Sequence, residues 1–216
     1  MSLDDLAHQV RPAAGEPAGA LVLMHGRGTS EHDLVPLFDV FDPERRLLCV
    51  APRGPLSLPP GGRHWYVLGG IPTPDPETFL SSVAALEGWF DALADDSGIP
   101  IERTVLGGFS QGAVMSWALG AGPDRPRPAG VLALSGFMPQ VPGFALQEDL
   151  EGLSVAVVHG TQDQIIPVEF GQAARDRAQA AGAEVLYLES PVPHTIDPGT
   201  IPELVAWLRA RTTTSP

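Results

Sequence analysis

The strongest constraint on the fold is a regular alternation between short, continuously apolar runs and longer amphipathic ones. Six apolar runs have the composition of strands: residues 20–25, 46–51, 104–109, 130–135, 154–159 and 184–189. Five amphipathic stretches have the composition of helices: residues 31–41, 76–96, 111–119, 168–182 and 201–211. Continuous hydrophobicity indicates strands that are covered on both faces, as in a parallel sheet. The alternation therefore predicts an α/β fold with a doubly wound, mostly parallel sheet flanked by helices.

The composition narrows the class of protein. The chain has 216 residues, 44% of them hydrophobic, so we expect a single domain over residues 1–216. Its formal net charge of −13 disfavours nucleic acid and anionic membranes as partners, because both bind basic surfaces. All 13 basic residues are arginine, which excludes Schiff-base, pyridoxal-phosphate and phosphate-loop chemistry that needs lysine.

Two further features predict the compartment. The first residues have neither the basic start nor the apolar run of a signal peptide, and no apolar run is long enough to cross a bilayer. The one cysteine, Cys49, lies in a predicted strand, so an internal disulfide or a cysteine-rich metal site is excluded. We expect a cytoplasmic, soluble protein without stable membrane insertion, in which Cys49 is a buried strand residue.

A G-x-S-x-G motif spans Gly108 to Gly112 and centres on Ser110. It lies where a predicted strand ends and a predicted helix begins, which is the context that a nucleophilic serine requires in such a motif. The two glycines remove side chains that would collide in the tight turn. The helix N-terminus directs free N–H groups and the positive end of its dipole at the reacting oxygen. We therefore predict that Ser110 is a nucleophile.

A nucleophilic serine needs a base and an acid that orients the base. In the order Ser–acid–His, the base must follow both other members, and only His159 and His194 follow Ser110. His194 lies in a loop after the last predicted strand and fits the base. Asp163 lies four residues beyond a strand end and fits the acid, while His159 ends that strand and is interpreted as structural.

The negative charge of a tetrahedral intermediate needs backbone N–H donors. One is expected from Gln111, the residue after the nucleophile. The other is expected from Arg27, in the His25-Gly26-Arg27-Gly28 loop after the first predicted strand of the sheet. A direct catalytic role of the Arg27 side chain is the alternative to this use of its backbone.

Taken together, five segments resemble the phospholipase/carboxylesterase family, which includes bacterial carboxylesterases and acyl-protein thioesterases. They are "HGRGTSEHDLVPLF", "GGFSQGAVMSWALG", "LSGFMP", "VVHGTQDQIIPV" and "PHTIDPGTIPELVAWL". The resemblance implies an α/β-hydrolase fold, the triad Ser110, Asp163 and His194, and the oxyanion donors Arg27 and Gln111. Two positions depart from the family pattern, Ala113 and Pro193. Pro193 matters more, because proline fixes φ immediately before His194.

The connections predict an open site. The segment from Gly136 to Leu153 has only 18 residues, too few for a helical cap domain, so loops should form the walls. Apolar residues of these loops are candidates for substrate binding: Trp65, Tyr66, Leu68, Phe137, Met138, Ile165 and Ile166. We expect hydrolysis of a small-molecule ester or thioester without metal or cofactor, and a possible homodimer contact at the apolar rim. Two alternatives remain, a catalytically silent binding module and perhydrolase or lyase chemistry on the same triad.

Overall fold

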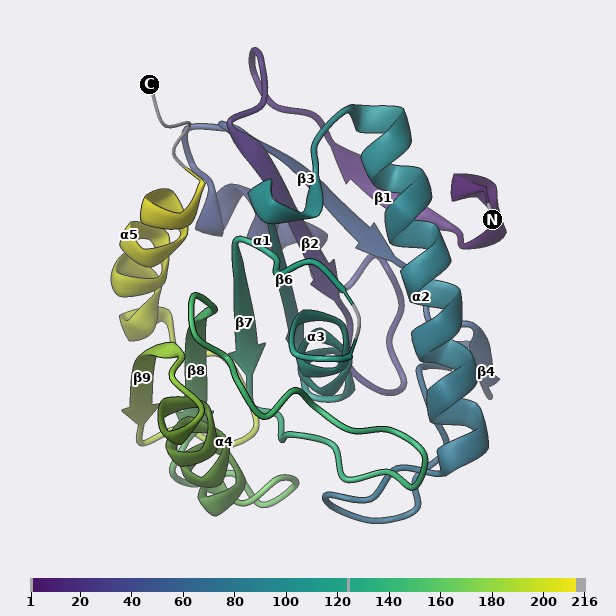
Figure 1. Ribbon diagram of the computed structural model, residues 1–216, viewed down its shortest axis with the longest axis vertical. Coiled ribbons are helices and arrows are strands. Elements are labelled where there is room, and N and C mark those ends of the chain that lie inside the picture. Colours follow the sequence, from purple (N-terminus) through teal and green to yellow (C-terminus); the bar gives the residue numbers. More distant parts are fainter. Residues whose placement is uncertain (1, 124, 213–216) are drawn as a thin grey trace.

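A seven-stranded sheet forms the centre of the computed structural model, which describes residues 2–123 and 125–212 (Figure 1). Its strands are β1 (His8–Arg11), β2 (Gly19–Met24), β3 (Leu47–Pro52), β6 (Thr104–Phe109), β7 (Gly130–Leu134), β8 (Ser154–Gly160) and β9 (Glu184–Ser190). Their order across the sheet is β1-β3-β2-β6-β7-β8-β9. Only β1 runs antiparallel to its neighbour, so the predicted mostly parallel α/β sheet is confirmed.

Within the described residues, five α-helices cover the two faces of this sheet. They are α1 (Val35–Phe41), α2 (Pro76–Ser97), α3 (Gln111–Gly120), α4 (Val168–Ala180) and α5 (Ile201–Arg211). In Figure 1, α2, α3 and α4 lie in front of the sheet and α1 lies behind it. Strand β2 shows the two cores that result. Val22 and Met24 pack with residues of α2 and α3, whereas Leu21 and Leu23 pack with residues of α1 and α5. The strands are therefore buried on both faces, as their continuous hydrophobicity predicts.

Three parts of the fold differ from the pattern read in the sequence. The edge strand β1 is polar and short, and it forms because it pairs with β3. A separate hairpin joins β4 (Leu56–Leu58) to β5 (Gly62–His64) within a proline- and glycine-rich connection. Helix α1 begins at Val35 instead of residue 31, because residues 31–34 form a turn in which buried Glu31 pairs with Arg53.

The single cysteine lies where the sequence places it, in β3. Cys49 is fully buried, and its sulfur accepts a hydrogen bond from the Arg11 guanidinium at 2.9 Å. Burial raises the pKa of the Cys49 thiol to about 12, so the group stays protonated at neutral pH. This is the environment of a structural cysteine.

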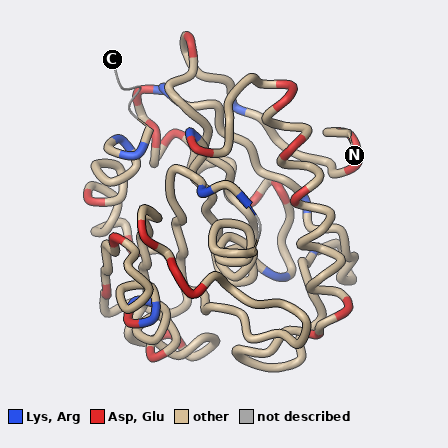
Figure 2. Tube along the Cα trace, in the orientation of Figure 1, with Lys and Arg blue, Asp and Glu red and all other residues tan. Residues whose placement is uncertain are grey.

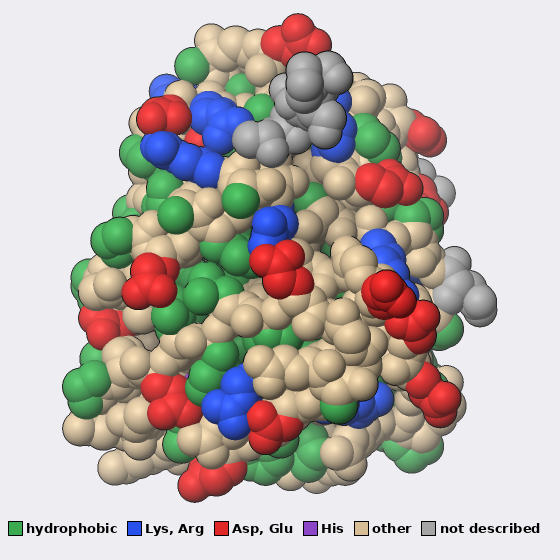
Figure 3. Space-filling model, turned by 60° about the vertical axis from the view of Figure 1, so that its left-hand side comes forward, with side chains coloured by type: hydrophobic (Ala, Val, Ile, Leu, Met, Phe, Trp, Pro, Cys, Tyr) green, Lys and Arg blue, Asp and Glu red, His purple; other side chains and the backbone are tan. Residues whose placement is uncertain are grey.

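Acidic residues occur along the whole length of the chain. Figure 2 shows Asp and Glu spread along the whole trace, and Figure 3 shows acidic, basic and hydrophobic side chains interspersed on one face. In the part of the chain that the structure describes, no helix is both long and apolar enough to pass through a bilayer.

The parallel strands set the location of a site. Because β2, β6, β7, β8 and β9 run parallel, the loops that follow their carboxyl ends gather at one edge of the sheet. These loops carry Arg27, Ser110, Phe137, Asp163 and His194, and no helix is described between residues 136 and 153. The edge is consequently walled by loops.

Candidate active site

Ser110 occupies a strained turn between β6 and α3. Its φ of 57° and ψ of −118° are rare for a residue with a side chain, and such a conformation costs about 1–3 kcal/mol. The Ser110 N–H donates to the Leu134 carbonyl at 2.9 Å, which holds the turn against β7. The flanking glycines permit the geometry, since a Cβ at Gly108 would strike the backbone of Gly112, and one at Gly112 would strike the Met24 carbonyl.

Asp163 and His194 form a short hydrogen bond. His194 Nδ1 lies 2.6 Å from Asp163 Oδ2, and Asp163 Oδ1 accepts the N–H groups of Ile165 at 2.8 Å and Ile166 at 2.9 Å. Burial opposes ionisation of Asp163, but the hydrogen bonds from His194, Ile166 and Ile165 outweigh it and hold the carboxyl pKa below its ordinary value. A carboxylate facing Nδ1 makes this nitrogen the donor, which leaves Nε2 of neutral His194 as a proton acceptor.

The loop that carries His194 accommodates the unusual proline. The carbonyl of Pro193 accepts the Thr195 N–H at 2.7 Å, and the preceding carbonyl of Val192 accepts the Gln162 N–H at 3.1 Å. The ring of Phe109 contacts the imidazole, with centroids 4.7 Å apart. Pro193 is exposed and does not prevent the contact between His194 and the acid.

His159 supports the acid from behind. It is fully buried at the end of β8, and its Nε2 lies 2.8 Å from the Ile166 carbonyl and 3.5 Å from Asp163 Oδ2. The Ile166 N–H in turn donates to Asp163. His159 thus anchors the turn that presents the acid, in agreement with its interpretation as a structural residue.

A cavity of about 320 Å³ opens at this edge of the sheet. Its lining residues are Arg27, Tyr66, Leu68, Gly70, Ile71, Ser110, Gln111, Phe137, Ile165, Ile166 and His194. Ser110 and His194 therefore line the same cavity, together with both expected oxyanion residues. Gly70 and Ile71 were not predicted from the sequence. For Ile71 a signal was available, namely an apolar side chain in a proline- and glycine-rich loop.

Two of the residues expected in the pocket lie elsewhere. Met138 lines a neighbouring hollow on the other side of Phe137, and Trp65 is fully buried beneath the cavity. The Trp65 indole N–H donates to the His25 carbonyl at 2.8 Å. Its backbone N–H donates to Gln111 Oε1 at 3.0 Å, while Gln111 Nε2 donates to the Tyr66 carbonyl at 2.9 Å. The Gln111 side chain thus fastens the cavity wall to the start of α3.

Hydrogen bonds of His25 fix the loop after β2. His25 Nδ1 lies 2.7 Å from the Gly26 carbonyl, and His25 Nε2 accepts the Gly54 N–H at 2.9 Å. Burial lowers the pKa of His25, so the ring is neutral with its proton on Nδ1. In the described part of the chain, the backbone N–H groups of Arg27 and Gln111 have no protein acceptor. Both are free to bind an oxygen that enters the cavity.

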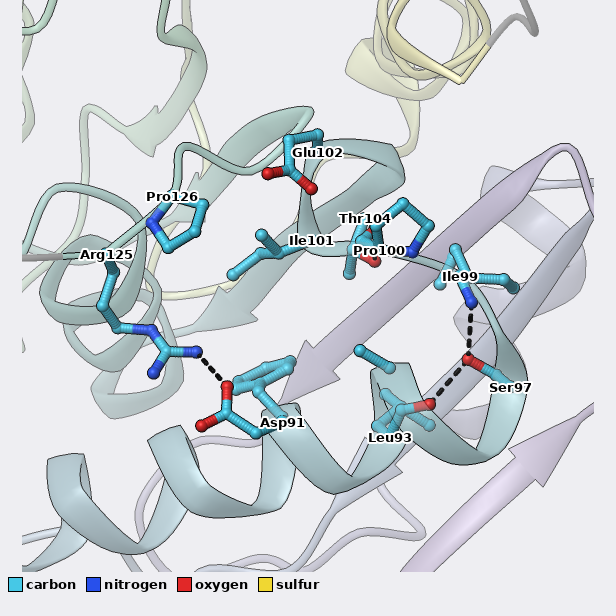
Figure 4. A pocket seen from close by; sticks show the side chains of 13 residues that line it. Asp91, Leu93, Ser97, Ile99, Pro100, Ile101, Glu102, Thr104, Arg125 and Pro126 are labelled. Carbon is cyan, nitrogen blue, oxygen red and sulfur yellow. Dashed lines mark hydrogen bonds and ion pairs between the residues drawn. The ribbon is translucent and has the colours of Figure 1, made fainter.

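A second hollow of about 270 Å³ lies far from these groups, at the amino-terminal ends of β2 and β6 (Figure 4). Apolar side chains of α2 and of residues 99–101 line it, and Arg125 reaches Asp91 across it at 2.8 Å. It contains neither a histidine nor an activated serine, since the Ser97 hydroxyl donates to the Leu93 carbonyl. Among the described residues, no group of three or more His, Cys, Asp or Glu side chains is arranged to hold a metal ion.

A family model described as phospholipase/carboxylesterase matches residues 7–210. The chain belongs to this family. Two proteins named acyl-protein thioesterase 1 are similar to it over most of its length. The protein from Yarrowia lipolytica is 31% identical over 76% of this chain and 78% of its own. The protein from Gibberella zeae is 30% identical over 97% of each.

Solved structures agree on the fold. A carboxylesterase from Mesorhizobium loti superposes with a TM-score of 0.82 at 23% identity, covering 94% of both chains. The Bacillus cereus carboxylesterase gives a TM-score of 0.81 at 22% identity, covering 95% of this chain and 94% of its own. The chain is thus an α/β-hydrolase of the phospholipase/carboxylesterase family and a hydrolytic enzyme of the esterase and thioesterase type.

Proposed function

We propose that this phospholipase/carboxylesterase is a serine hydrolase that cleaves carboxylic esters or thioesters through an acyl-enzyme on Ser110. One observation carries the proposal: His194, hydrogen-bonded to buried Asp163 at 2.6 Å, lines the same cavity as Ser110. The strained turn at Ser110 and the free N–H groups of Arg27 and Gln111 support it.

In the proposed reaction, His194 Nε2 takes the proton of Ser110 as the hydroxyl oxygen attacks the carbonyl carbon. The tetrahedral oxyanion binds the N–H groups of Arg27 and Gln111, each of which is worth about 3 kcal/mol of barrier. The protonated imidazole then gives its proton to the leaving alcohol or thiol as the bond to it breaks. Water, deprotonated by His194, releases the acid and restores Ser110, while Asp163 stabilises the imidazolium throughout.

The cavity indicates the size of the acyl group. Five apolar or aromatic side chains form its walls: Tyr66, Leu68, Phe137, Ile165 and Ile166. Leu68 is 57% exposed and Ile165 is 64% exposed, so the mouth is open. A volume of about 320 Å³ suits short and medium acyl chains better than long ones. The names of the curated relatives favour testing thioesters beside oxygen esters. The apolar rim would equally suit a contact between two copies of the chain.

Intact mass after treatment with a fluorophosphonate tests the proposal. One adduct that maps to Ser110 and is absent from Ser110→Ala is the expected result. Ser135→Ala is the matched control, because Ser135 also follows a strand at this edge with a positive φ of 50°. A natural protein that stays unlabelled would contradict the proposal and favour the binding-module alternative. Analysis of products with and without peroxide separates hydrolysis from perhydrolase chemistry.

A further inference from the structure

The guanidinium of Arg27, at the mouth of the cavity, has no role in the proposed mechanism. Arg27 contributes its backbone N–H, but its guanidinium is exposed and lines the cavity. Among the described residues, this guanidinium makes no hydrogen bond or ion pair. An unpaired arginine beside the reacting serine is unusual in a chain with 26 acidic and 13 basic residues.

The rest of the cavity contains nothing that neutralises this charge. Its described lining includes no Asp or Glu, and Arg27 is its one permanently charged member. The nearest functional carboxylate, Asp163, is buried and already accepts three hydrogen bonds. A guanidinium matches carboxylate and phosphate groups with two parallel hydrogen bonds, and apolar walls around it strengthen the attraction.

Covalent geometry limits how far the anion can be from the reacting carbonyl. The Arg27 N–H is proposed to hold the oxyanion, so the carbonyl oxygen lies about 3 Å from this nitrogen. The side chain reaches roughly 6 Å from Cα to Cζ across five bonds. The guanidinium therefore meets a group only a few bonds away from the scissile carbonyl.

We infer that Arg27 is a specificity-determining residue, whose side chain selects esters or thioesters that carry a carboxylate or phosphate a few bonds from the scissile carbonyl. The inference rests on the proposed function and deepens it by naming the substrate class. The overall charge of −13 repels anions from the molecule, so a preference for them must come from a local contact. Without that contact, the repulsion between the acidic protein and an anionic substrate should lower the rate for anionic substrates relative to neutral ones.

Two isosteric substrate pairs test which side of the carbonyl the anion occupies. Mono(4-nitrophenyl) glutarate and 4-nitrophenyl glutaramate differ only in an acyl-side carboxylate against a carboxamide. The butyryl esters of 4-hydroxybenzoate and 4-hydroxybenzamide differ in the same way on the leaving-group side. The quantity measured is the ratio of kcat/KM for the anionic to the neutral member of each pair. A disturbance of the oxyanion donors by a substitution affects both members and cancels in this ratio.

The variants are Arg27→Gln, Arg27→Lys and the control Arg45→Gln. Arg45 is also exposed and without a side-chain partner among the described residues, but it lies before β3 at the opposite edge of the sheet. We expect the natural ratio to exceed one in at least one pair and to fall about three- to tenfold in Arg27→Gln. Arg27→Lys should retain part of the ratio, and Arg45→Gln all of it. The natural ratio should also shrink as salt is raised from about 0.02 to 0.5 M.

Equal ratios in the natural protein and Arg27→Gln, for both pairs, would overturn the inference while leaving the proposed hydrolysis intact. A second measurement does not depend on turnover. Calorimetry on Ser110→Ala uses two uncleaved amides, 4-butyramidobenzoate with its carboxylate on the leaving-group side and glutaranilate with its carboxylate on the acyl side. At least one of them should bind with a Kd about three- to tenfold tighter than on Ser110→Ala/Arg27→Gln. Equal affinities of the two variants for both amides would refute the anion contact even if no ester were hydrolysed.

Discussion

Replacing the buried acid Asp163 by asparagine tests the proposed triad most directly, because the amide has almost the same shape. The carboxylate uses Oδ1 for the N–H groups of Ile165 and Ile166 and Oδ2 for His194. An asparagine that keeps its oxygen on the two N–H groups turns its NH₂ toward His194. Nδ1 of the imidazole must then accept a hydrogen bond from this NH₂, so the ring proton lies on Nε2. A protonated Nε2 can no longer take the proton of Ser110.

The hydrogen bonds decide which way the amide faces. The opposite orientation would set the NH₂ against the N–H donors of Ile165 and Ile166, and each unsatisfied donor costs about 1–3 kcal/mol. The unproductive tautomer is therefore favoured by about 2–6 kcal/mol. A wrong tautomer in a serine triad lowers kcat by about 10⁴, which corresponds to about 5.5 kcal/mol of barrier. We expect Asp163→Asn to lose about 10³- to 10⁴-fold in kcat, with little change in KM.

The assay is steady-state hydrolysis of 4-nitrophenyl butyrate, with circular dichroism to verify folding. Asp197→Asn is the matched control. Asp197 lies three residues after His194 and caps a short 3₁₀ helix, η3 (Pro198–Thr200), by accepting the Gly199 N–H at 2.8 Å, a role that asparagine fills equally well. If folded Asp163→Asn kept kcat within tenfold of the natural value, Asp163 would not be the acid that orients His194.

Three other predictions concern stability. Gln111→Leu leaves the Trp65 N–H without a partner, whereas the Tyr66 carbonyl keeps His64 Nδ1 at 3.1 Å. Urea unfolding should therefore show a loss of about 1–3 kcal/mol, and a loss below about 0.5 kcal/mol would contradict the fastening role. Gly112→Ala forces a Cβ into backbone and should cost about 3 kcal/mol or more, whereas Gly15→Ala, with open space around it, should change unfolding by less than about 0.5 kcal/mol. The folded-state pKa of Asp163 is below its unfolded value near 4, so the stability this group supplies is present above about pH 4 and is lost as pH falls through the lower, folded value. Urea unfolding at pH 7 and pH 3 should therefore show a larger loss for the natural protein than for Asp163→Asn, and equal losses would contradict this.

Much of the fold was predictable because its central strands are buried on both faces. Burial on both sides selects continuous apolar runs, and residues 104–109 were predicted with the same limits that β6 has. Strand β1 has no such signal, because an edge strand faces solvent and is stabilised by its pairing with β3. The β4–β5 hairpin is similarly a product of backbone pairing, here between two segments of only three residues each. Periodicity carries no information about either.

Prediction of the site was limited in a different way. Chain order and strand ends were enough to bring Asp163 and His194 together, because parallel strands fix where their following loops meet. Aromatic residues near the site were ambiguous, since Trp65 and Tyr66 are adjacent in sequence and only Tyr66 lines the cavity. The orientation of Trp65 depends on hydrogen bonds to His25 and Gln111, which are distant in the chain. No local pattern reveals such contacts.

The turn at residues 163–166 both presents the acid and forms the pocket wall. Ile165 and Ile166 line the cavity with their side chains, while their N–H groups bind Asp163. The segment with Leu68 and Ile71 borders the same cavity without a hydrogen bond to the triad among the described residues. Substitutions at residues 68–71, natural or engineered, can therefore change the preference for the acyl group almost independently of the catalytic step. Substitutions at residues 163–166 change the pocket wall and the hydrogen bonds to the acid at the same time. New substrate specificities should therefore arise at residues 68–71 and stay rare at residues 163–166.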